Sequence, residues 1–293
     1  MSESGPEEAE LVERVIFADG FSERCAALVT RLVHRRAGRE GVGRSSLLGP
    51  GEDFAGHRPY RQGEDLRKLD WDLLARLDKP FVRVERREAG ERWAIWLDRS
   101  ASMGIGPPGK LQRAAECAAG LARVGMALGA RVRIVLSSGS DGGPRGFELR
   151  RATDWGGLLA FLQAARADGP GGLAALCESE RPGSDRLFGI GDFFDAEPRK
   201  WFVHQARGRR LGGVQILAPT EFAPPLGATR WLDLEGAGEL EVVVDDALLT
   251  AYERRLEARI EGWSSAAARH GARHVVGSSA RPFEELLQPM LGD

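Results

Sequence analysis

The stretch RWAIWLDRSASM, residues 92–103, places an apolar segment directly before a cluster of side-chain oxygens. Residues 93–97 are all apolar, which is typical of a strand that is covered on both faces of a sheet. Asp98 ends this strand, and Ser100 and Ser102 complete the pattern D-x-S-x-S. A helix is predicted to begin at Lys110, so these oxygens lie in the loop between a strand and a helix.

The rest of the chain alternates predicted strands with predicted helices. Strands are predicted at residues 81–86, 92–98, 131–137, 146–151, 186–192, 212–218, 241–245 and 273–277. Helices are predicted at residues 110–128, 155–165, 198–207 and 246–270. This alternation predicts an α/β fold with a mostly parallel sheet and helices on both faces. In such sheets ligands bind at the carboxyl ends of the strands, which is where Asp98 lies.

The composition excludes several classes of protein. With 293 residues, of which 42% are hydrophobic, the chain is long enough to bury a full core. Its net charge of -2 gives no overall attraction to nucleic acid, and its three cysteines are too few for a disulfide framework. The N-terminus is acidic and no apolar run reaches about eighteen residues, so we expect neither export nor a membrane span. A cytoplasmic location is the expectation that fits these features.

The first 80 residues are predicted to be an extension packed on a main domain of residues 81–293. The extension contains a predicted helix at residues 21–36 and a loop rich in Gly, Ser and Pro at residues 38–56. Residues 58–80 carry many charges of both signs, which fits either a nucleic-acid surface or internal ion pairs. The matching carboxylates favour ion pairs. The residues expected to pair are Arg61, Asp65, Arg67 and Asp70.

The loop after Asp98 also resembles a nucleotide-binding loop. GIGPPGK, residues 104–110, fits G-x-G-x-x-G and most of G-x-x-x-x-G-K. However, Gly104 comes six residues after Asp98 instead of directly after the strand, and the two prolines remove N–H donors that would bind phosphate. Leu111 stands where a P-loop requires a hydroxyl for magnesium. We therefore interpret this segment as the entry loop of the helix.

A metal site is the second interpretation of the same loop. The oxygens of Asp98, Ser100 and Ser102 can converge, because alternate residues of an extended turn point the same way. Asp192, after the apolar strand RLFGI, is expected to deliver a second carboxylate from another strand end. Carboxylates and hydroxyls completed by water suit Mg²⁺ better than zinc. Alternatively, these side chains only cap the turn and the following helix.

Four segments, in this order, resemble the bacterial domain-of-unknown-function 58 (DUF58) family. They are YRQGEDLRKLDWDLLAR (60–76), LDRSASM (97–103), GIGDFFD (189–195) and LDLEGAGELEVVVDDALLTAY (232–252). The resemblance extends from about residue 51 to the C-terminus. The family is similar to the von Willebrand factor A domain, which implies a central, mostly parallel sheet flanked by helices and a metal-ion-dependent adhesion site.

The resemblance also implies which residues hold the metal. Asp98, Ser100 and Ser102 match the first metal loop of the family, and Asp192 matches the last. The implied metal is Mg²⁺, with Mn²⁺ or Ca²⁺ as alternatives. The family pattern includes a Thr after two glycines, whereas this chain has Leu173 there, in GPGGLAAL. Without that hydroxyl the site is degenerate, and metal binding is expected to be weak or absent.

Family members commonly lie beside MoxR-type AAA+ ATPases, which implies an adaptor or partner of such an ATPase. We therefore expect a non-enzymatic protein-interaction module in which a carboxylate of the other protein completes the metal coordination. Met103, Phe193 and Phe194 are predicted as apolar contacts at the rim if they face outward. The alternative for Phe193 and Met103 is burial under the loop. The alternative is a magnesium-dependent phosphohydrolase with Asp98 as nucleophile. That chemistry requires a second carboxylate two residues later, where Ser100 stands.

Overall fold

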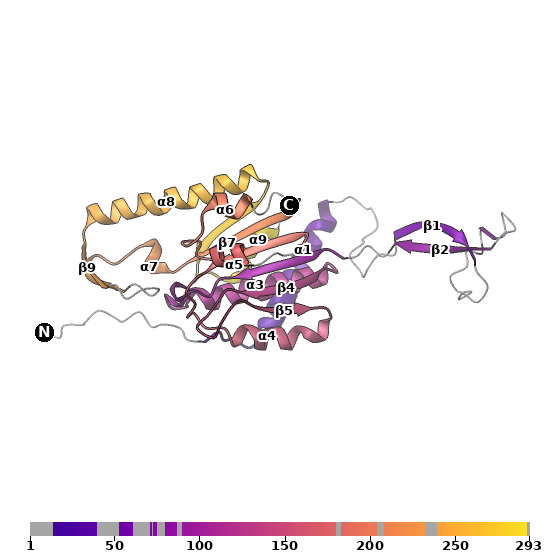
Figure 1. Cartoon of the computed structure of the whole chain (residues 1–293), viewed down its shortest axis with the longest axis horizontal. Coiled ribbons are helices and arrows are strands. Elements are labelled where there is room, and N and C mark those ends of the chain that lie inside the picture. The colour runs from indigo at the N-terminus through magenta and orange to yellow at the C-terminus, as the bar shows by residue number, and fades with distance from the viewer. Residues whose placement is uncertain are drawn as a thin grey trace.

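The computed structural model describes residues 14–39, 53–60, 71, 73–74, 80–86, 90–179, 183–203, 208–232 and 239–291 (Figure 1). The helices are α1 (Phe21–Arg39), α3 (Lys110–Ala127), α4 (Trp155–Gln163), α5 (Leu173–Ser179), α6 (Pro198–Val203), α7 (Pro219–Phe222), α8 (Asp246–Arg269) and α9 (Phe283–Leu291). The strands are β1 (Asp53–Pro59), β2 (Phe81–Arg86), β3 (Arg92–Leu97), β4 (Arg131–Leu136), β5 (Arg145–Leu149), β6 (Arg186–Gly191), β7 (Arg210–Leu217), β8 (Gly227–Leu232), β9 (Glu239–Val244) and β10 (Arg273–Ser278).

Six of these strands form the central sheet in the order β10-β7-β6-β3-β4-β5. Neighbouring strands are parallel except for the edge strand β5, which runs antiparallel to β4. This arrangement confirms the predicted α/β fold. The chain moves outward from β3 to β4 and β5 and then places β6 on the other side of β3. The topological switch point, where ligands bind in such sheets, therefore lies between β3 and β6.

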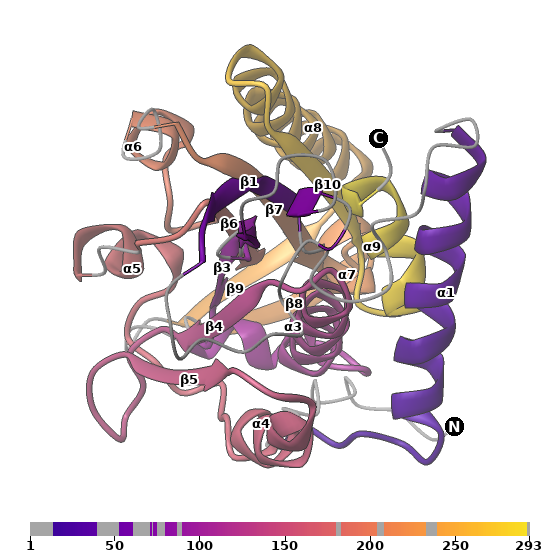
Figure 2. The same ribbon diagram turned by 90° about the vertical axis from the view of Figure 1, so that its right-hand side faces the viewer.

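Helices cover both faces of the sheet, with α1, α3, α4 and α9 on one side and α5, α6 and α8 on the other (Figure 2). The central strand β3 shows why both layers form. Successive side chains of a strand point to opposite faces, so Trp93 and Ile95 join one apolar core and Ala94 and Trp96 join the other. A strand that is apolar on both faces is stable only between two such layers.

The N-terminal helix α1 packs against α3 and α9. Four residues along one of its faces are buried: Phe21, Cys25, Leu28 and Leu32. At the edge of this face Arg24 donates hydrogen bonds of 2.8 and 2.7 Å to the carboxylate of Glu284 on α9. The predicted amphipathic helix is present, and its apolar stripe closes the core on this side of the sheet.

Two predicted strands pair outside the central sheet, which corrects the expectation that they belong to it. β2 pairs antiparallel with β1 in a hairpin that extends away from the main body (Figure 1). The expected boundary between residues 80 and 81 falls inside this hairpin, and residues 53–56 are strand instead of loop. β9, predicted at residues 241–245, pairs with β8 in a second hairpin. Apolar patterns predict a strand but do not specify its neighbour.

The ion pairs expected in the charged segment cannot be located, because Arg61, Asp65, Arg67 and Asp70 lie outside the described residues. In the part of the chain that the structure describes, no helix is both long and apolar enough to cross a membrane.

Candidate functional site

Asp98 and Asp192 meet at the switch point of the sheet. Asp98 follows β3 and Asp192 follows β6, and because these strands are parallel neighbours, both carboxylates emerge at the same edge. The backbone N–H of Asp98 donates to the carbonyl oxygen of Ile190 (2.9 Å), which continues the pairing of the strands. Asp98 is 0% exposed and Asp192 is 2% exposed. Two strand-end carboxylates thus share one buried site.

The loop after β3 brings two serines to the same place. A 3-10 helix at Ala101–Gly104 folds this loop back on itself. The N–H of Ser100 donates to Asp98 Oδ1 (2.8 Å), and the hydroxyls of Ser100 and Ser102 lie 3.1 Å apart. The Ser102 hydroxyl then donates to Asp192 Oδ2 (2.8 Å). All four predicted ligand residues are therefore joined in one hydrogen-bonded chain.

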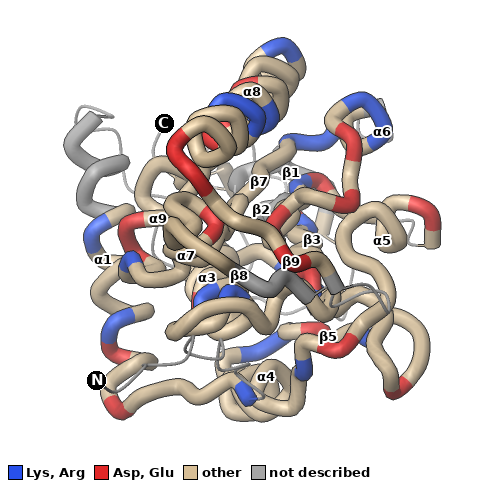
Figure 3. Tube along the Cα trace, turned by 90° about the vertical axis from the view of Figure 1, so that its left-hand side faces the viewer, with Lys and Arg blue, Asp and Glu red and all other residues tan. Residues whose placement is uncertain are grey.

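Lys110, the first residue of α3, places its ammonium group in this cluster. Its Nζ lies 2.9 Å from Asp192 Oδ2 and 2.6 Å from Oε1 of Glu221 on α7, and its side chain is 0% exposed. Burial disfavours the charged form of Lys110, but the two carboxylates outweigh it and its pKa is raised. Lys110 is the last residue of the segment that resembles a nucleotide-binding loop, but in the structure its ammonium group binds the carboxylates of Asp192 and Glu221. Figure 3 views this end of the molecule, where acidic and basic segments meet around α3 and α7.

Asp192 is held firmly by the strands and loops around it. The N–H of Phe194 donates to its Oδ1 (3.0 Å), and the side-chain amide of Gln215 donates to its backbone carbonyl (2.8 Å). Gln215 is buried in β7, where it interrupts the apolar segment GGVQILA. A polar residue within an apolar strand is the one cue in the sequence that could have identified this supporting residue.

One oxygen of Asp98 remains without a partner. Its Oδ2 is buried and accepts no hydrogen bond from the described residues. Two glycines allow the backbone to approach this carboxylate: a Cβ atom at Gly172 would lie 2.3 Å from Oδ2, and one at Gly191 would lie 2.6 Å from the Asp98 Cβ. Burial, together with the charges of Asp192 and Asp195, raises the pKa of Asp98 well above its ordinary value. An unpartnered oxygen of this kind is suited to a cation or to a donor from a ligand.

Gly172, and not Leu173, is the residue that faces Asp98. Leu173 begins α5 and is 0% exposed in the apolar core on that side of the sheet. Asp195 fixes this turn, because its Oδ2 accepts the N–H groups of Gly172 (3.1 Å) and Ala174 (2.9 Å). This turn therefore presents backbone and no hydroxyl to Asp98.

The loop after β6 decides which aromatic residues reach the surface. Phe193 has a φ of 62°, which is uncommon for a residue other than glycine, and its buried ring packs on Trp263 with centroids 4.8 Å apart. Arg259 of α8 donates to the carbonyl oxygens of Phe193 and Phe194 and holds this turn. Phe193 and Met103 are 0% exposed, whereas Phe194 is 38% exposed. The rim prediction is therefore wrong for Phe193 and Met103, for which the alternative of burial under the loop is correct, and Phe194 is the one of the three at the surface.

These residues fit a hard cation in part. Asp98, with its free Oδ2, and the hydroxyls of Ser100 and Ser102 are the oxygen ligands that Mg²⁺ prefers. Asp192 is already neutralised by Lys110, and the turn at Gly172 supplies no hydroxyl. Among the described residues, no group of three or more His, Cys, Asp and Glu is placed to hold a metal. The set of oxygen donors is thus incomplete, and metal binding remains a prediction.

Residues 56–146 match the family described as "Protein of unknown function DUF58". Among solved structures, the one titled "Crystal Structure of the SpRpn10 VWA domain" is similar over 68% of this chain and 94% of that chain, with 12% identity and a TM-score of 0.36. No curated protein matches the chain. The family match covers less than half of the chain, and the order of the six strands is that of an α/β fold with a mostly parallel sheet.

Proposed function

We propose that this protein is a non-enzymatic protein-interaction module that binds its partner at the switch point between β3 and β6. The observation that carries the proposal is the buried chain of polar groups from Asp98 to Glu221, which lies at the carboxyl ends of the strands. A buried polar cluster costs free energy unless its groups are paired, and here Asp98 Oδ2 lacks a partner among the described residues. A ligand group supplied by another protein would complete it.

We further propose that the site is a degenerate metal-ion-dependent adhesion site. Asp98, Ser100, Ser102 and Asp192 would hold the cation, with Mg²⁺ as the first candidate and Mn²⁺ or Ca²⁺ as alternatives. A bound cation supplies an electrophilic position that a carboxylate of the other protein can complete. Lys110 and the missing hydroxyl both weaken this binding, so the interaction depends partly on the fixed charges of the chain itself.

The proposed partner is a MoxR-type AAA+ ATPase, and the family resemblance is the support for this choice. Phe194 is an exposed apolar residue next to this site, and the cations of Lys110 and Arg259 lie 5.7 and 5.4 Å from its ring centre. An aromatic ring held in this way at the border of a polar centre is a typical anchor of a protein interface.

A pull-down with a MoxR-type ATPase from the same organism tests the proposal. We expect binding to the wild type, a clear loss in Asp98→Ala combined with Asp192→Ala, and a loss in Phe194→Ser, whose exposed position leaves the fold intact. The matched control is Glu253→Ala combined with Glu257→Ala, two exposed carboxylates of α8. Binding that survives chelator and both sets of site variants would show that the ATPase uses another face.

The phosphohydrolase alternative is not favoured by the geometry around Asp98. Ser100 occupies the position of the second carboxylate, and its N–H donates to Asp98 Oδ1. Asp192, the nearest strand-end carboxylate, is paired with Lys110. Neither arrangement provides a free acid or base beside the Asp98 carboxylate.

A further inference from the structure

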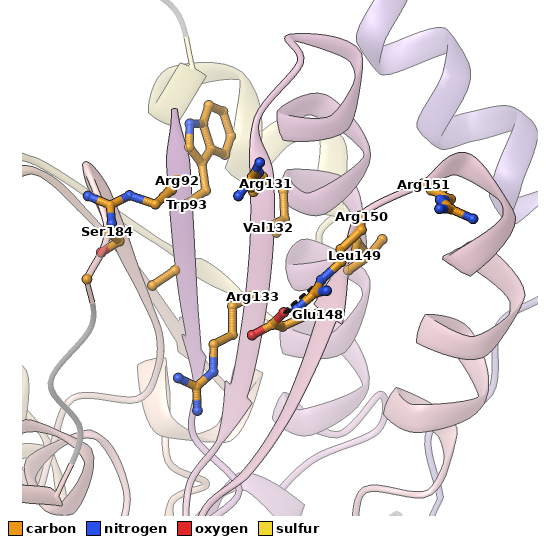
Figure 4. A pocket seen from close by; sticks show the side chains of 12 residues that line it. Arg92, Trp93, Arg131, Val132, Arg133, Glu148, Leu149, Arg150, Arg151 and Ser184 are labelled. Carbon is orange, nitrogen blue, oxygen red and sulfur yellow. Dashed lines mark hydrogen bonds and ion pairs between the residues drawn. The ribbon is translucent and has the colours of Figure 1, made fainter. Parts of the chain in front are cut away.

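A second polar surface lies at the other end of the strands from Asp98. A hollow of about 610 Å³ opens over the beginnings of β3 and β4 and the end of β5 (Figure 4). This volume is within the range of small-molecule sites, about 300–1,000 Å³. Five of the residues that line it are arginines and only one, Glu148, is a carboxylate, in a chain whose net charge is -2.

The strand register gathers four of these arginines on one face of the sheet. Arg92 of β3 pairs with Arg131 of β4, and Arg150 follows β5 directly opposite Arg131. Arg133 lies two residues after Arg131 and therefore points to the same face. All four are exposed, and Figure 4 shows Arg133 and Arg150 on either side of Glu148, which is 2.6 Å from Arg150. Among the described residues, Glu148 and, at the edge of the hollow, Asp185 beside Arg92 are the carboxylates that lie against these arginines, so the lining carries more positive than negative side chains.

Ser184 adds an unused hydroxyl to the same hollow. It lies shortly before β6, is 8% exposed, and its Oγ has no hydrogen-bond partner among the described residues. Buried hydroxyls are nearly always hydrogen-bonded, and because no described residue accepts from this one, it is a candidate donor to a ligand. Figure 4 places Ser184 beside Arg92, whose own ion pair with Asp185 is exposed and long, at 3.4 Å.

We propose that this hollow binds a compact anion with at least two phosphoryl groups. Guanidinium groups bind phosphate oxygens through two parallel hydrogen bonds, and tetrahedral phosphates accept donors from several strands at once. An oligophosphate carries more negative charge than a simple dicarboxylate within the same volume, which suits a lining with an excess of arginines. Trp93, the aromatic residue of the lining, is 1% exposed and offers no face on which a base could stack. Recognition is therefore by charge and by hydrogen bonds to phosphate.

Calorimetric titration of the full chain with inorganic tripolyphosphate at low salt tests the proposal. We expect binding to the wild type and at least a tenfold weaker affinity in Arg131→Gln combined with Arg133→Gln, because two charge-assisted contacts are lost. Ser184→Ala is expected to weaken binding several-fold. Arg255→Gln, an exposed arginine of α8, is the matched control and should bind as the wild type does. Asp98→Ala should also bind normally, which separates this site from the proposed interaction site.

Three outcomes would overturn the proposal. They are the absence of binding to the wild type, equal affinity in the double arginine variant with its circular dichroism unchanged, and tighter binding of an oligoglutamate peptide or a single-stranded oligonucleotide than of tripolyphosphate. The last result would identify the hollow as a surface for an acidic macromolecule. Because the substituted arginines are exposed, loss of folding is not expected to obscure the comparison.

Discussion

The Nζ atom of Lys110 lies 2.9 Å from Oδ2 of Asp192, so a fixed positive charge already balances one of the two carboxylates expected to hold a metal. Glu221 holds the same ammonium group from its other side, at 2.6 Å. A tethered ammonium and a divalent cation compete for one carboxylate, because like charges repel strongly at short range. Lys110 would therefore weaken metal binding at this site, as the missing hydroxyl would.

Replacing Lys110 with Met should destabilise the protein and increase its response to divalent cations. Removing one partner of a buried ion pair costs about 3–5 kcal/mol, since Asp192 and Glu221 are left uncompensated. We expect millimolar Mn²⁺ to restore part of this loss, and thermal unfolding with and without Mn²⁺ measures both effects. Lys200→Met is the control, because that side chain is 70% exposed. An equal Mn²⁺ response in wild type and Lys110→Met would contradict the competition.

Asp98→Asn should abolish cation binding without lowering stability at neutral pH. The charged form of Asp98 is disfavoured by burial and by the neighbouring carboxylates. A neutral side chain of the same shape therefore avoids the free-energy cost of a buried negative charge. Calorimetry with Mg²⁺ and Mn²⁺ should show weak binding to the wild type and none to the variant. Chemical unfolding should give a free energy at least equal to that of the wild type. Unchanged cation binding in Asp98→Asn would place the metal elsewhere.

Gly172→Ala should lower stability, whereas Gly171→Ala should be tolerated. A Cβ atom at Gly172 would lie 2.3 Å from Asp98 Oδ2, but one at Gly171 would make an ordinary contact of 3.4 Å with Ala175. Displacing the packed turn typically costs about 1–3 kcal/mol. Urea unfolding of the two variants gives the comparison directly. If both variants unfold like the wild type, the turn does not approach Asp98 as closely as described.

His274 should make the protein less stable as the pH falls from neutral toward 4. Burial lowers its pKa from 6.5 to about 4, and its ring packs against Phe193 and Trp263. Between these two pH values the unfolded chain binds a proton that the folded chain does not. The free energy of unfolding therefore decreases as the pH is lowered through this window, by on the order of 3 kcal/mol in total.

The measurement is the difference in unfolding free energy between wild type and His274→Gln from pH 7 to pH 4. The wild type must be compared with the variant because other groups also titrate in this pH range. Burial raises the pKa values of Asp98, Asp195 and Glu221, and these groups stabilise the folded state as the pH falls. His270→Gln, an exposed histidine at the end of α8, serves as the control. Parallel pH profiles for wild type and His274→Gln would show that this histidine is not the group responsible.

Periodicity in the sequence predicts most elements of the main domain and the edge of the sheet at which the site lies. The helix predicted at residues 110–128 is observed at Lys110–Ala127, and the all-apolar segment before Asp98 is the central strand β3. Both follow from periodicity and from residues close together in the chain. The convergence of Asp98 and Asp192 was also predictable, because parallel strands end at a common edge.

The groups that meet at this edge depend on long-range packing, which local patterns do not specify. Lys110 and Glu221 are 111 residues apart, and their contact depends on how α3 and α7 pack against the sheet. Gly172 lies beside Asp98, where the sequence pattern predicts Leu173, because of a single backbone turn that no local pattern specifies. The burial of Phe193 depends on another such turn. The arginine-lined hollow likewise arises from the register of β3, β4 and β5. Local sequence sets the backbone form of each segment, but long-range packing and register choose the partners of its side chains.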